Sequence, residues 1–267
     1  MSSTATERAG QLYRDGRLAE AVSAAGAAVR AAVTEAAPRL LLAELLLFEG
    51  ALERAETVLD AAVALDPGVA LPVAEFRQLL RAEVARRQVR HDGRVPEFLE
   101  PPTPALRAAL AARVALRGGA TAAAAGCAAE VEALRPRVAG RIDGKAFDDL
   151  RDACDLHAGF VDVLTPTGKY FWIPTERIAR IEFHPPQRPR DLYWRRASMA
   201  VRDGPDGDVY VPATYDAQGV EDAALRLGRA TDWRDLAGLV IGVGQRTWLL
   251  GNEASTVQAL TTLEFAA

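Results

Sequence analysis

Histidine and cysteine, two residues from which catalytic and metal sites are commonly built, are scarce in this chain. Its 267 residues include three histidines and two cysteines. The cysteines, Cys127 and Cys154, are too few for a disulfide framework or a zinc knuckle, so we expect a protein of a reducing compartment. Catalysis by imidazole has few possible positions. The sequence therefore favours a protein that holds surfaces together over one that moves protons.

Long hydrophobic runs and a strong excess of one charge are also lacking. The most apolar segment, Leu40 to Gly50, is short and contains Glu44, whereas a membrane span needs about 20 apolar residues. The first residues, MSSTATERAGQLYRDG, show no basic stretch followed by an apolar one, as a signal peptide would. The formal net charge is -4. We therefore expect a soluble, cytoplasmic protein with neither a nucleic acid nor a membrane as partner.

Residues 1–140 form an alanine- and leucine-rich half that repeats itself. The segments DGRLAEAV and EGALERAE place Gly16 and Gly50 34 residues apart. The segment RGGATAAAA places Gly118 a further 68 residues on, which is twice that period. A period of 34 is that of tetratricopeptide repeats, in which each unit is a pair of antiparallel helices. We predict a tetratricopeptide-like helical domain over residues 1–140, with these glycines in the turns between helices.

Local signals place a long helix and a helix start within this half. Apolar spacing predicts a helix over about residues 69–90, and Thr103 followed by Pro104 predicts the cap and first position of the next helix. The long helix carries a cluster of arginines: Arg77, Arg81, Arg86, Arg87, Arg90 and Arg94. Acidic residues nearby offset their charge, so we interpret the cluster as a solvated face. Contact with nucleic acid is the alternative interpretation.

Residues 141–267 are rich in Val, Ile and aromatic residues between Gly and Pro, which predicts strands. We expect strands at 159–165, 169–173 and 178–183, and a hairpin around GPDG at 204–207. One helix is expected at about 220–229, followed by two or three more strands within 238–250 and 256–265. The predicted fold is therefore α+β, with the helical domain followed by a β-rich domain over 141–267, built as a small barrel or a bent sheet.

The candidates for chemistry are weak. Cys154 and His157 are three residues apart and could form a thiolate pair, but a buried cysteine beside an ordinary histidine explains them better. A metal site could be drawn from the acids near His157, which are Asp148, Asp149, Asp152 and Asp155. Because these acids alternate with apolar residues, we interpret them as the solvated face of a helix. We predict no catalytic, metal or cofactor-binding residue.

Four segments of the second half form a distinctive ordered set. They are GKYFWIPTERIARIEF (168–183), RDLYWRRASM (190–199), VYVPATY (209–215) and GRATDWRD (228–235). In this order they resemble the ImpE family, also called TagJ or SciE, which are accessory proteins of bacterial type VI secretion systems. The helical first half is similar too, so the resemblance covers nearly the whole chain.

The resemblance implies a non-enzymatic adaptor. Family members are similar to proteins that bind a short amphipathic helix of the small subunit of the contractile sheath. They are thought to link this subunit to the ATP-driven unfoldase that recycles contracted sheath. The resemblance implies no catalytic residue. The alternative function is an enzyme of unknown reaction with a site between the domains, near Cys154 and His157, using these with Asp152 or using the acidic residues of the TDW motif.

We predict the partner-binding residues from apolar side chains that exceed the needs of one core. The leucines of PRLLLAELLLFEG exceed a single helical stripe, so an apolar groove is expected between helices of residues 5–90. The predicted contacts are Leu41, Leu45, Phe48, Phe76 and Trp172. On its strand, Trp172 shares a face with Tyr170, and this face meets either the helical domain or a partner. Trp194 and Trp233 are expected to be buried and structural.

Overall fold

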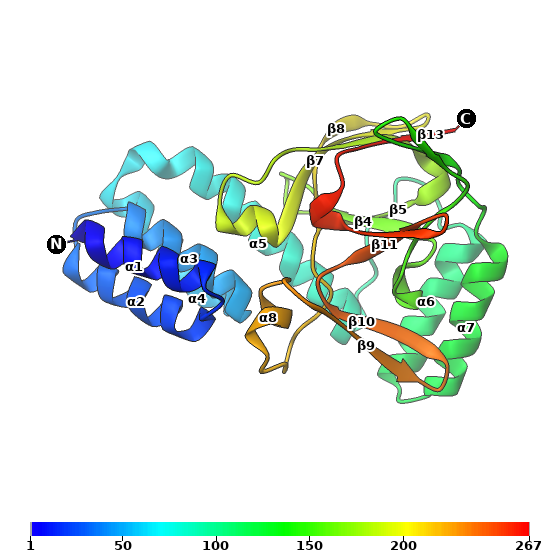
Figure 1. Cartoon of the computed structure of the whole chain (residues 1–267), viewed down its shortest axis with the longest axis horizontal. Coiled ribbons are helices and arrows are strands. Elements are labelled where there is room, and N and C mark those ends of the chain that lie inside the picture. Colours follow the sequence, from blue (N-terminus) through cyan, green and yellow to red (C-terminus); the bar gives the residue numbers. More distant parts are fainter. Residues whose placement is uncertain (1, 267) are drawn as a thin grey trace.

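Helices come first in this chain and strands follow (Figure 1). The computed structural model describes residues 2–266, with side-chain surroundings from residue 5 onward. The helices are α1 (Ser2–Arg14), α2 (Leu18–Ala31), α3 (Ala37–Glu49), α4 (Leu52–Leu65), α5 (Ala70–His91), α6 (Pro104–Arg117), α7 (Thr121–Leu134) and α8 (Ala223–Arg226). The strands are β1 (Gly140–Ile142), β2 (Lys145–Phe147), β3 (Leu150–Asp152), β4 (Phe160–Leu164), β5 (Tyr170–Pro174), β6 (Ile178–Phe183), β7 (Trp194–Val201), β8 (Asp206–Pro212), β9 (Thr231–Leu236), β10 (Leu239–Gly244), β11 (Thr247–Leu250), β12 (Glu253–Thr256) and β13 (Thr262–Phe265). This order confirms the predicted α+β fold class.

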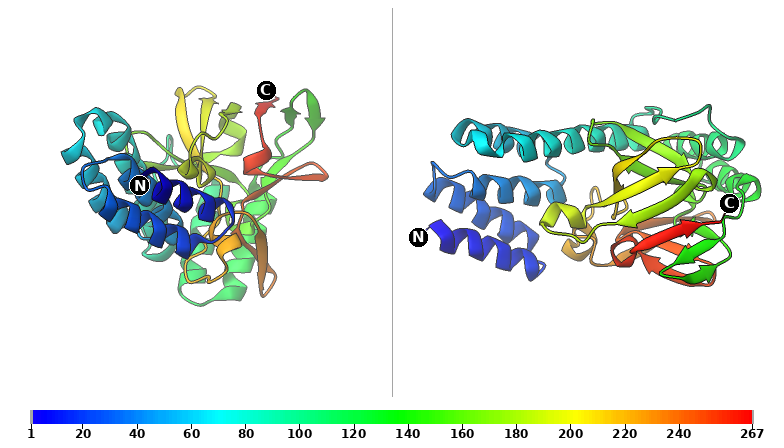
Figure 2. Two further views of the ribbon diagram at one scale, coloured as in Figure 1. Left: turned by 60° about the vertical axis from the view of Figure 1, so that its left-hand side comes forward. Right: turned by 90° about the horizontal axis from the view of Figure 1, so that it is seen from above.

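The first four helices form two pairs that stack side by side (Figures 1 and 2). Gly16 and Gly50 turn the chain within each pair with φ of 82° and 78°, a conformation that glycine adopts without steric cost. In the pair α6–α7 the left-handed residue is Gly119, with φ of 76°, one position after the predicted Gly118. Small buried alanines such as Ala25 let neighbouring helices approach closely.

Helix α5 runs from these pairs to the sheet, as the right view in Figure 2 shows. Its bounds lie within one residue of the predicted 69–90. The next helix starts as predicted, because the Thr103 side chain accepts a hydrogen bond from the Leu106 N–H (3.2 Å) and Pro104 occupies the first turn. Helices α6 and α7 then lie beside the β-rich part, at the other end of the molecule from α1 (Figure 1).

The main sheet has eight strands in the order β2-β1-β13-β6-β7-β8-β4-β5, and its neighbouring strands are antiparallel. It is open, with β2 and β5 at its edges, so of the two predicted forms the sheet describes it better than a closed barrel. Two small sheets, β9–β10 and β3–β11–β12, complete this part. The predicted strands at 159–165, 169–173 and 178–183 match β4, β5 and β6, and the predicted hairpin matches β7–β8.

The predicted helix at 220–229 is wrong in length. Only α8, a single turn, is helical there. The Asp222 side chain caps its start by accepting from the Ala224 N–H (2.7 Å), and Gly228 leaves the helical conformation with φ of 62°. The following TDW motif forms β9, a strand that the sequence did not predict.

One hydrophobic cluster joins the helical half to a face of the main sheet. It contains Phe76 of α5, Trp172 of β5 and Trp194 of β7. Phe171 and Ile173, which alternate with Trp172 along β5, pack into a second cluster on the opposite face. Trp172 therefore lies at the junction between sheet and helices. Among residues 2–266, no helix is both long and apolar enough to cross a lipid bilayer.

Candidate functional site

The five predicted contact residues all lie in or against the cluster that joins the two halves. Leu41 of α3 is half-buried and packs on the edge of that cluster. The other four are buried: Leu45, Phe48, Phe76 and Trp172. Phe48 meets the ring of Tyr193 edge-on at 5.4 Å, and Trp172 stacks on Phe160 at 4.0 Å. In this structure these four side chains pack against other residues of the same chain.

The aromatic pair of the YFW segment belongs to a buried polar network. The Tyr170 hydroxyl donates to Asp162 (2.8 Å), and the Trp172 indole N–H donates to the Tyr170 oxygen (2.9 Å). Asp162 lies on β4 and is fully buried. A buried tyrosine or tryptophan needs a hydrogen-bond partner for its polar atom. Here Asp162 is the partner of Tyr170, and the Tyr170 oxygen is the partner of Trp172.

The network continues through two buried arginines to helix α5. Arg246 contacts Asp152 at 2.6 Å and Asp162 at 2.5 Å. Arg86 of α5 approaches Asp162 at 3.4 Å and Glu83 at 3.3 Å. These ion pairs tie helix α5 to the main sheet and to the loop before β11.

The charges of this network are stabilised by their neighbours. Burial opposes ionisation of Asp162, but the charges of Arg246 and Arg86 outweigh burial, so the pKa of Asp162 is well below its usual value. Glu83 also accepts from the Trp194 indole at 3.1 Å. Arg86 is buried between carboxylates from two elements. The predicted solvated face is therefore wrong for this residue.

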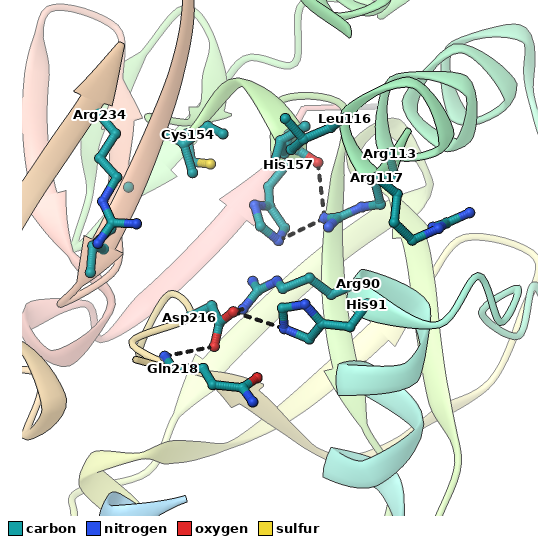
Figure 3. A pocket seen from close by; sticks show the side chains of 14 residues that line it. Arg90, His91, Arg113, Leu116, Arg117, Cys154, His157, Asp216, Gln218 and Arg234 are labelled. Atoms are coloured by element: carbon teal, nitrogen blue, oxygen red, sulfur yellow. Dashed lines mark hydrogen bonds and ion pairs between the residues drawn. The ribbon is translucent and has the colours of Figure 1, made fainter. Parts of the chain in front are cut away.

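Beside this network lies a cleft of about 280 Å³, between the ends of α5 and α6 and strand β10 (Figure 3). Its cationic side chains are Arg90, Arg113, Arg117 and Arg234, and His91 lines it as well. Asp216 is the acidic residue of its lining, and it contacts Arg90 at 3.3 Å and His91 at 3.0 Å. The cleft thus carries more positive than negative charge.

Arg113 is the most unusual of these side chains, because it is buried without a carboxylate partner among residues 5–266. One of its nitrogens, Nη2, lies 3.2 Å from the Leu156 carbonyl oxygen and 3.0 Å from His157 Nε2. Its Nε has no hydrogen-bond partner within the described residues. Its guanidinium lies 5.0 Å from the centre of the Trp172 ring. Burial lowers the pKa of Arg113 to about 10.

Cys154 and His157 meet in this cleft, as neutral groups. Burial, reinforced by Asp152, raises the pKa of the Cys154 thiol to about 11. Burial and the nearby Arg113 hold the pKa of His157 well below its usual value. Because Arg113 donates to His157 Nε2, the imidazole proton sits on Nδ1, which has no partner within the described part of the chain. This pair lacks the thiolate that a nucleophile requires.

The same residues bring three metal-ligand types together but leave little room for a cation. Donor atoms of Asp152, Cys154 and His157 lie within 4.8 Å of one another. The Asp152 carboxylate is already occupied by Arg246, and it also accepts from the Tyr215 hydroxyl at 2.7 Å. The predicted solvated helix face is wrong here. Asp152 lies on β3 and His157 lies on the 3₁₀ turn Asp155–His157, and both side chains are buried.

The two tryptophans of the family motifs differ. Trp194 is buried, as predicted, and meets the Phe76 ring edge-on at 6.1 Å. Trp233, predicted to be buried, is 41% exposed. It lies on β9, whose central residues face solvent because this small sheet has only two strands. Only Tyr215 offers its ring a described aromatic neighbour, at 5.9 Å.

Three comparisons agree with this architecture. Residues 144–264 match the sequence model of the family described as ImpE protein. The chain is 31% identical over 257 residues to the type VI secretion system accessory component TagJ of Pseudomonas aeruginosa, covering 96% of this chain and 90% of that protein. An X-ray structure of a protein from Vibrio parahaemolyticus superimposes with a TM-score of 0.91 at 24% identity, covering 97% of this chain and 98% of that chain, which supports the fold.

The match to TagJ extends over both halves, and the family match contains the YFW, TDW and PATY segments. The chain therefore belongs to the ImpE family of type VI secretion accessory proteins.

Proposed function

We propose that this protein is an adaptor that binds a helix of the small subunit of the contractile sheath and has no turnover of its own. The sheath-recycling ATPase is the second partner in this proposal. Family membership supports the secretion system as the setting. The observation that carries the binding mode is an open groove on the first helix pair.

This groove lies between α1 and α2 and measures about 420 Å³. Its floor is small and apolar, formed by Ala5, Leu12, Ala24 and Ala27, while Arg8, Glu20, Ser23 and Arg30 line it as well. Alanines allow a partner helix to approach closely, and an amphipathic helix can bury its i, i+3, i+4 and i+7 side chains in such a groove. Helices α1 and α2, which line this groove, lie at the end of the helix stack, far from the sheet (Figure 1).

The five residues predicted from the sequence take an indirect part in this proposal. Of the five, Leu41 is half-buried, so it is the one that a partner helix reaching α3 could contact. Leu45, Phe48 and Phe76 are buried beneath the helices and hold the helical half in shape, and Trp172 is buried at the junction with the sheet. Direct contact is proposed for the exposed α1–α2 residues instead.

Titration calorimetry with a synthetic N-terminal helix of the cognate sheath small subunit tests the proposal. A single helix offers a modest interface, so we expect micromolar affinity, about −8 kcal/mol. Ala27 is exposed in the groove, and Ala27→Glu should weaken binding by at least about tenfold, because a longer, charged side chain would stand where an apolar stripe of the partner must pack.

Ala129→Glu is the matched control, because Ala129 is an exposed helical alanine on α7, outside the groove. It should bind the peptide like the parent. Changing the apolar stripe of the peptide to serine should abolish the heat of binding. If no segment of either sheath subunit or of the ATPase bound the purified chain, the proposal would be wrong.

The enzyme alternative has its own test at Cys154. A catalytic thiolate reacts with iodoacetamide quickly at neutral pH, whereas a buried thiol with a raised pKa reacts slowly. We expect Cys154 to be alkylated far more slowly than Cys127, which is partly exposed. Peptide mapping by mass spectrometry separates the two sites. Faster reaction at Cys154 would favour the enzyme.

A further inference from the structure

The arginine-lined cleft has a charge that the chain does not balance. Arg90 is held by Asp216, but Arg234 has no ion-pair partner among residues 5–266, and neither has the buried Arg113. Figure 3 shows Arg234 on one side of the cleft and Arg113 on the other, with His157 between them. Buried charges in proteins are normally paired. An unpaired, buried arginine that lines a cavity therefore needs an anion from elsewhere.

The cleft also has an apolar wall. Leu116, Leu156, Ile241 and Val243 line it together with the cationic groups. Binding sites for small organic ligands commonly combine an apolar lining with a few polar groups that fix orientation. Inorganic ions would leave this wall without a partner, whereas an anion with an apolar body would cover it.

Two residues of the lining each carry an unsatisfied polar atom. Arg113 Nε and His157 Nδ1 both lack a hydrogen-bond partner within the described chain, and both residues line the cleft. Both atoms are donors, since arginine has no acceptor and the histidine proton sits on Nδ1. Burial without a carboxylate lowers the pKa of Arg113 to about 10, which an incoming anion would reverse.

We propose that this cleft is a binding site for an organic anion, with its carboxylate or phosphate head between Arg113 and Arg234 and its apolar body against Leu116 and Ile241. The site goes beyond the helix-binding function and is separate from the α1–α2 groove. The anion has two possible sources, a free small molecule or an acidic side chain of a bound partner. Both present the same chemistry to the cleft.

Calorimetric titration of the full chain at low ionic strength tests the site with three probes. Benzoate combines a carboxylate with an apolar ring, benzamide has the ring without the charge, and inorganic phosphate has the charge without the ring. We expect benzoate to bind more tightly than either of the others. Added salt should weaken benzoate binding, because it screens the arginine charges.

Two substitutions with opposite expected signs locate the binding. Arg234→Ala should weaken benzoate binding roughly three- to tenfold, because it removes a charge-assisted contact. Asp216→Asn should tighten it roughly two- to fivefold, because it removes the repelling carboxylate and frees Arg90. If Asp216→Asn merely damaged the fold, its affinity for benzoate would not rise. Arg141→Ala is the matched control, since Arg141 is exposed on β1 and does not line the cleft.

The outcomes separate the two sources and the failure of the proposal. If Arg234→Ala weakens benzoate but not the sheath peptide, the ligand is a free small anion. If it weakens both, and replacing the glutamates of the peptide by glutamine has the same effect, the ligand is an acidic side chain of the partner. The proposal is overturned if neither benzoate nor phosphate binds, if benzamide binds as well as benzoate, or if Arg234→Ala behaves like Arg141→Ala. Ala27→Glu should leave benzoate binding unchanged, so the groove and the cleft can fail independently.

Discussion

Arg246 and Arg113 are both buried close to the junction of helices and sheet, but their surroundings differ. Arg246 lies between two carboxylates, Asp152 and Asp162. Arg113 has a carbonyl oxygen, a neutral imidazole and the face of Trp172. Burial alone would lower the pKa of both. The two carboxylates outweigh burial and raise the pKa of Arg246, whereas the pKa of Arg113 falls to about 10.

This difference separates structural charge from charge that is available for binding. Removing one member of a fully paired set leaves its partners buried and uncompensated, which is strongly destabilising. An arginine without a carboxylate leaves no such partner behind. The network around Arg246 should therefore hold the fold together, and the cleft around Arg113 should tolerate change. The following substitutions test this contrast.

The largest effect is expected for Arg246→Met. It keeps much of the side-chain volume but leaves Asp152 and Asp162 buried without their shared cation. We expect the free energy of unfolding to fall by about 5 kcal/mol, measured by urea denaturation. A loss below about 1 kcal/mol would show that the network contributes little to stability.

The two tryptophans should differ next. Trp194→Ala removes a buried ring and leaves Glu83 without an indole donor, so it should cost about 4 kcal/mol. Trp233→Ala removes a ring that is 41% exposed and should cost less than about 1 kcal/mol. Equal melting temperatures for the two variants would contradict this assignment.

Glu44 predicts a pH effect in the helical half, where it is buried among leucines. Burial raises its pKa from 4.5 to about 7, although Arg190 and Arg188 partly offset this. Between these values the unfolded chain loses the proton first, so stability should fall as pH rises from about 4.5 to 7. Glu44→Gln should remove this loss. The free energy of unfolding of the variant, measured against that of the parent, should therefore be roughly 1–3 kcal/mol higher at pH 8 than at pH 5.

Urea denaturation at the two pH values measures this difference. The exposed Glu53 on α4 is the matched control, and Glu53→Gln should follow the parent at both pH values. An equal change for both variants would mean that Glu44 ionises as freely as a surface acid.

A small effect is expected for Arg113→Met, far below that of Arg246→Met. It loses a contact with the Trp172 ring and hydrogen bonds to the Leu156 carbonyl and His157 Nε2, but it strands no carboxylate. We expect a cost of about 1 kcal/mol in the free energy of unfolding. A cost comparable with that of Arg246→Met would erase the contrast on which the anion site depends.

Local patterns in the sequence predicted much of the fold. Thr103 before Pro104 gave the start of α6, and the glycines at 16 and 50 gave the turns of the repeat pairs, because these signals act over a few residues. The single turn at α8 and the strand β9 were missed. Helix length there depends on Asp222 and Gly228, and β9 exists through its pairing with β10.

The charge network and the cleft could not be predicted in this way. Arg246 is 84 residues from Asp162 and 94 from Asp152, so no local spacing connects them. Arg86 stood in a cluster that looked solvated, and only the packing of α5 against β4 shows that it is buried. A single arginine in an alanine-rich helix, as Arg113 is, carries no sequence signal of an unpaired charge.

Amide hydrogen exchange of the full chain, with and without the sheath small-subunit helix, tests the proposed function most directly. We predict slower exchange at exposed and fraying amides of α1 and α2, residues 2–31, because a bound helix would cover their groove. Helices α6 and α7 should exchange as in the free protein. Slower exchange confined to α6–α7 or to β9–β10, with α1 and α2 unchanged, would contradict the account.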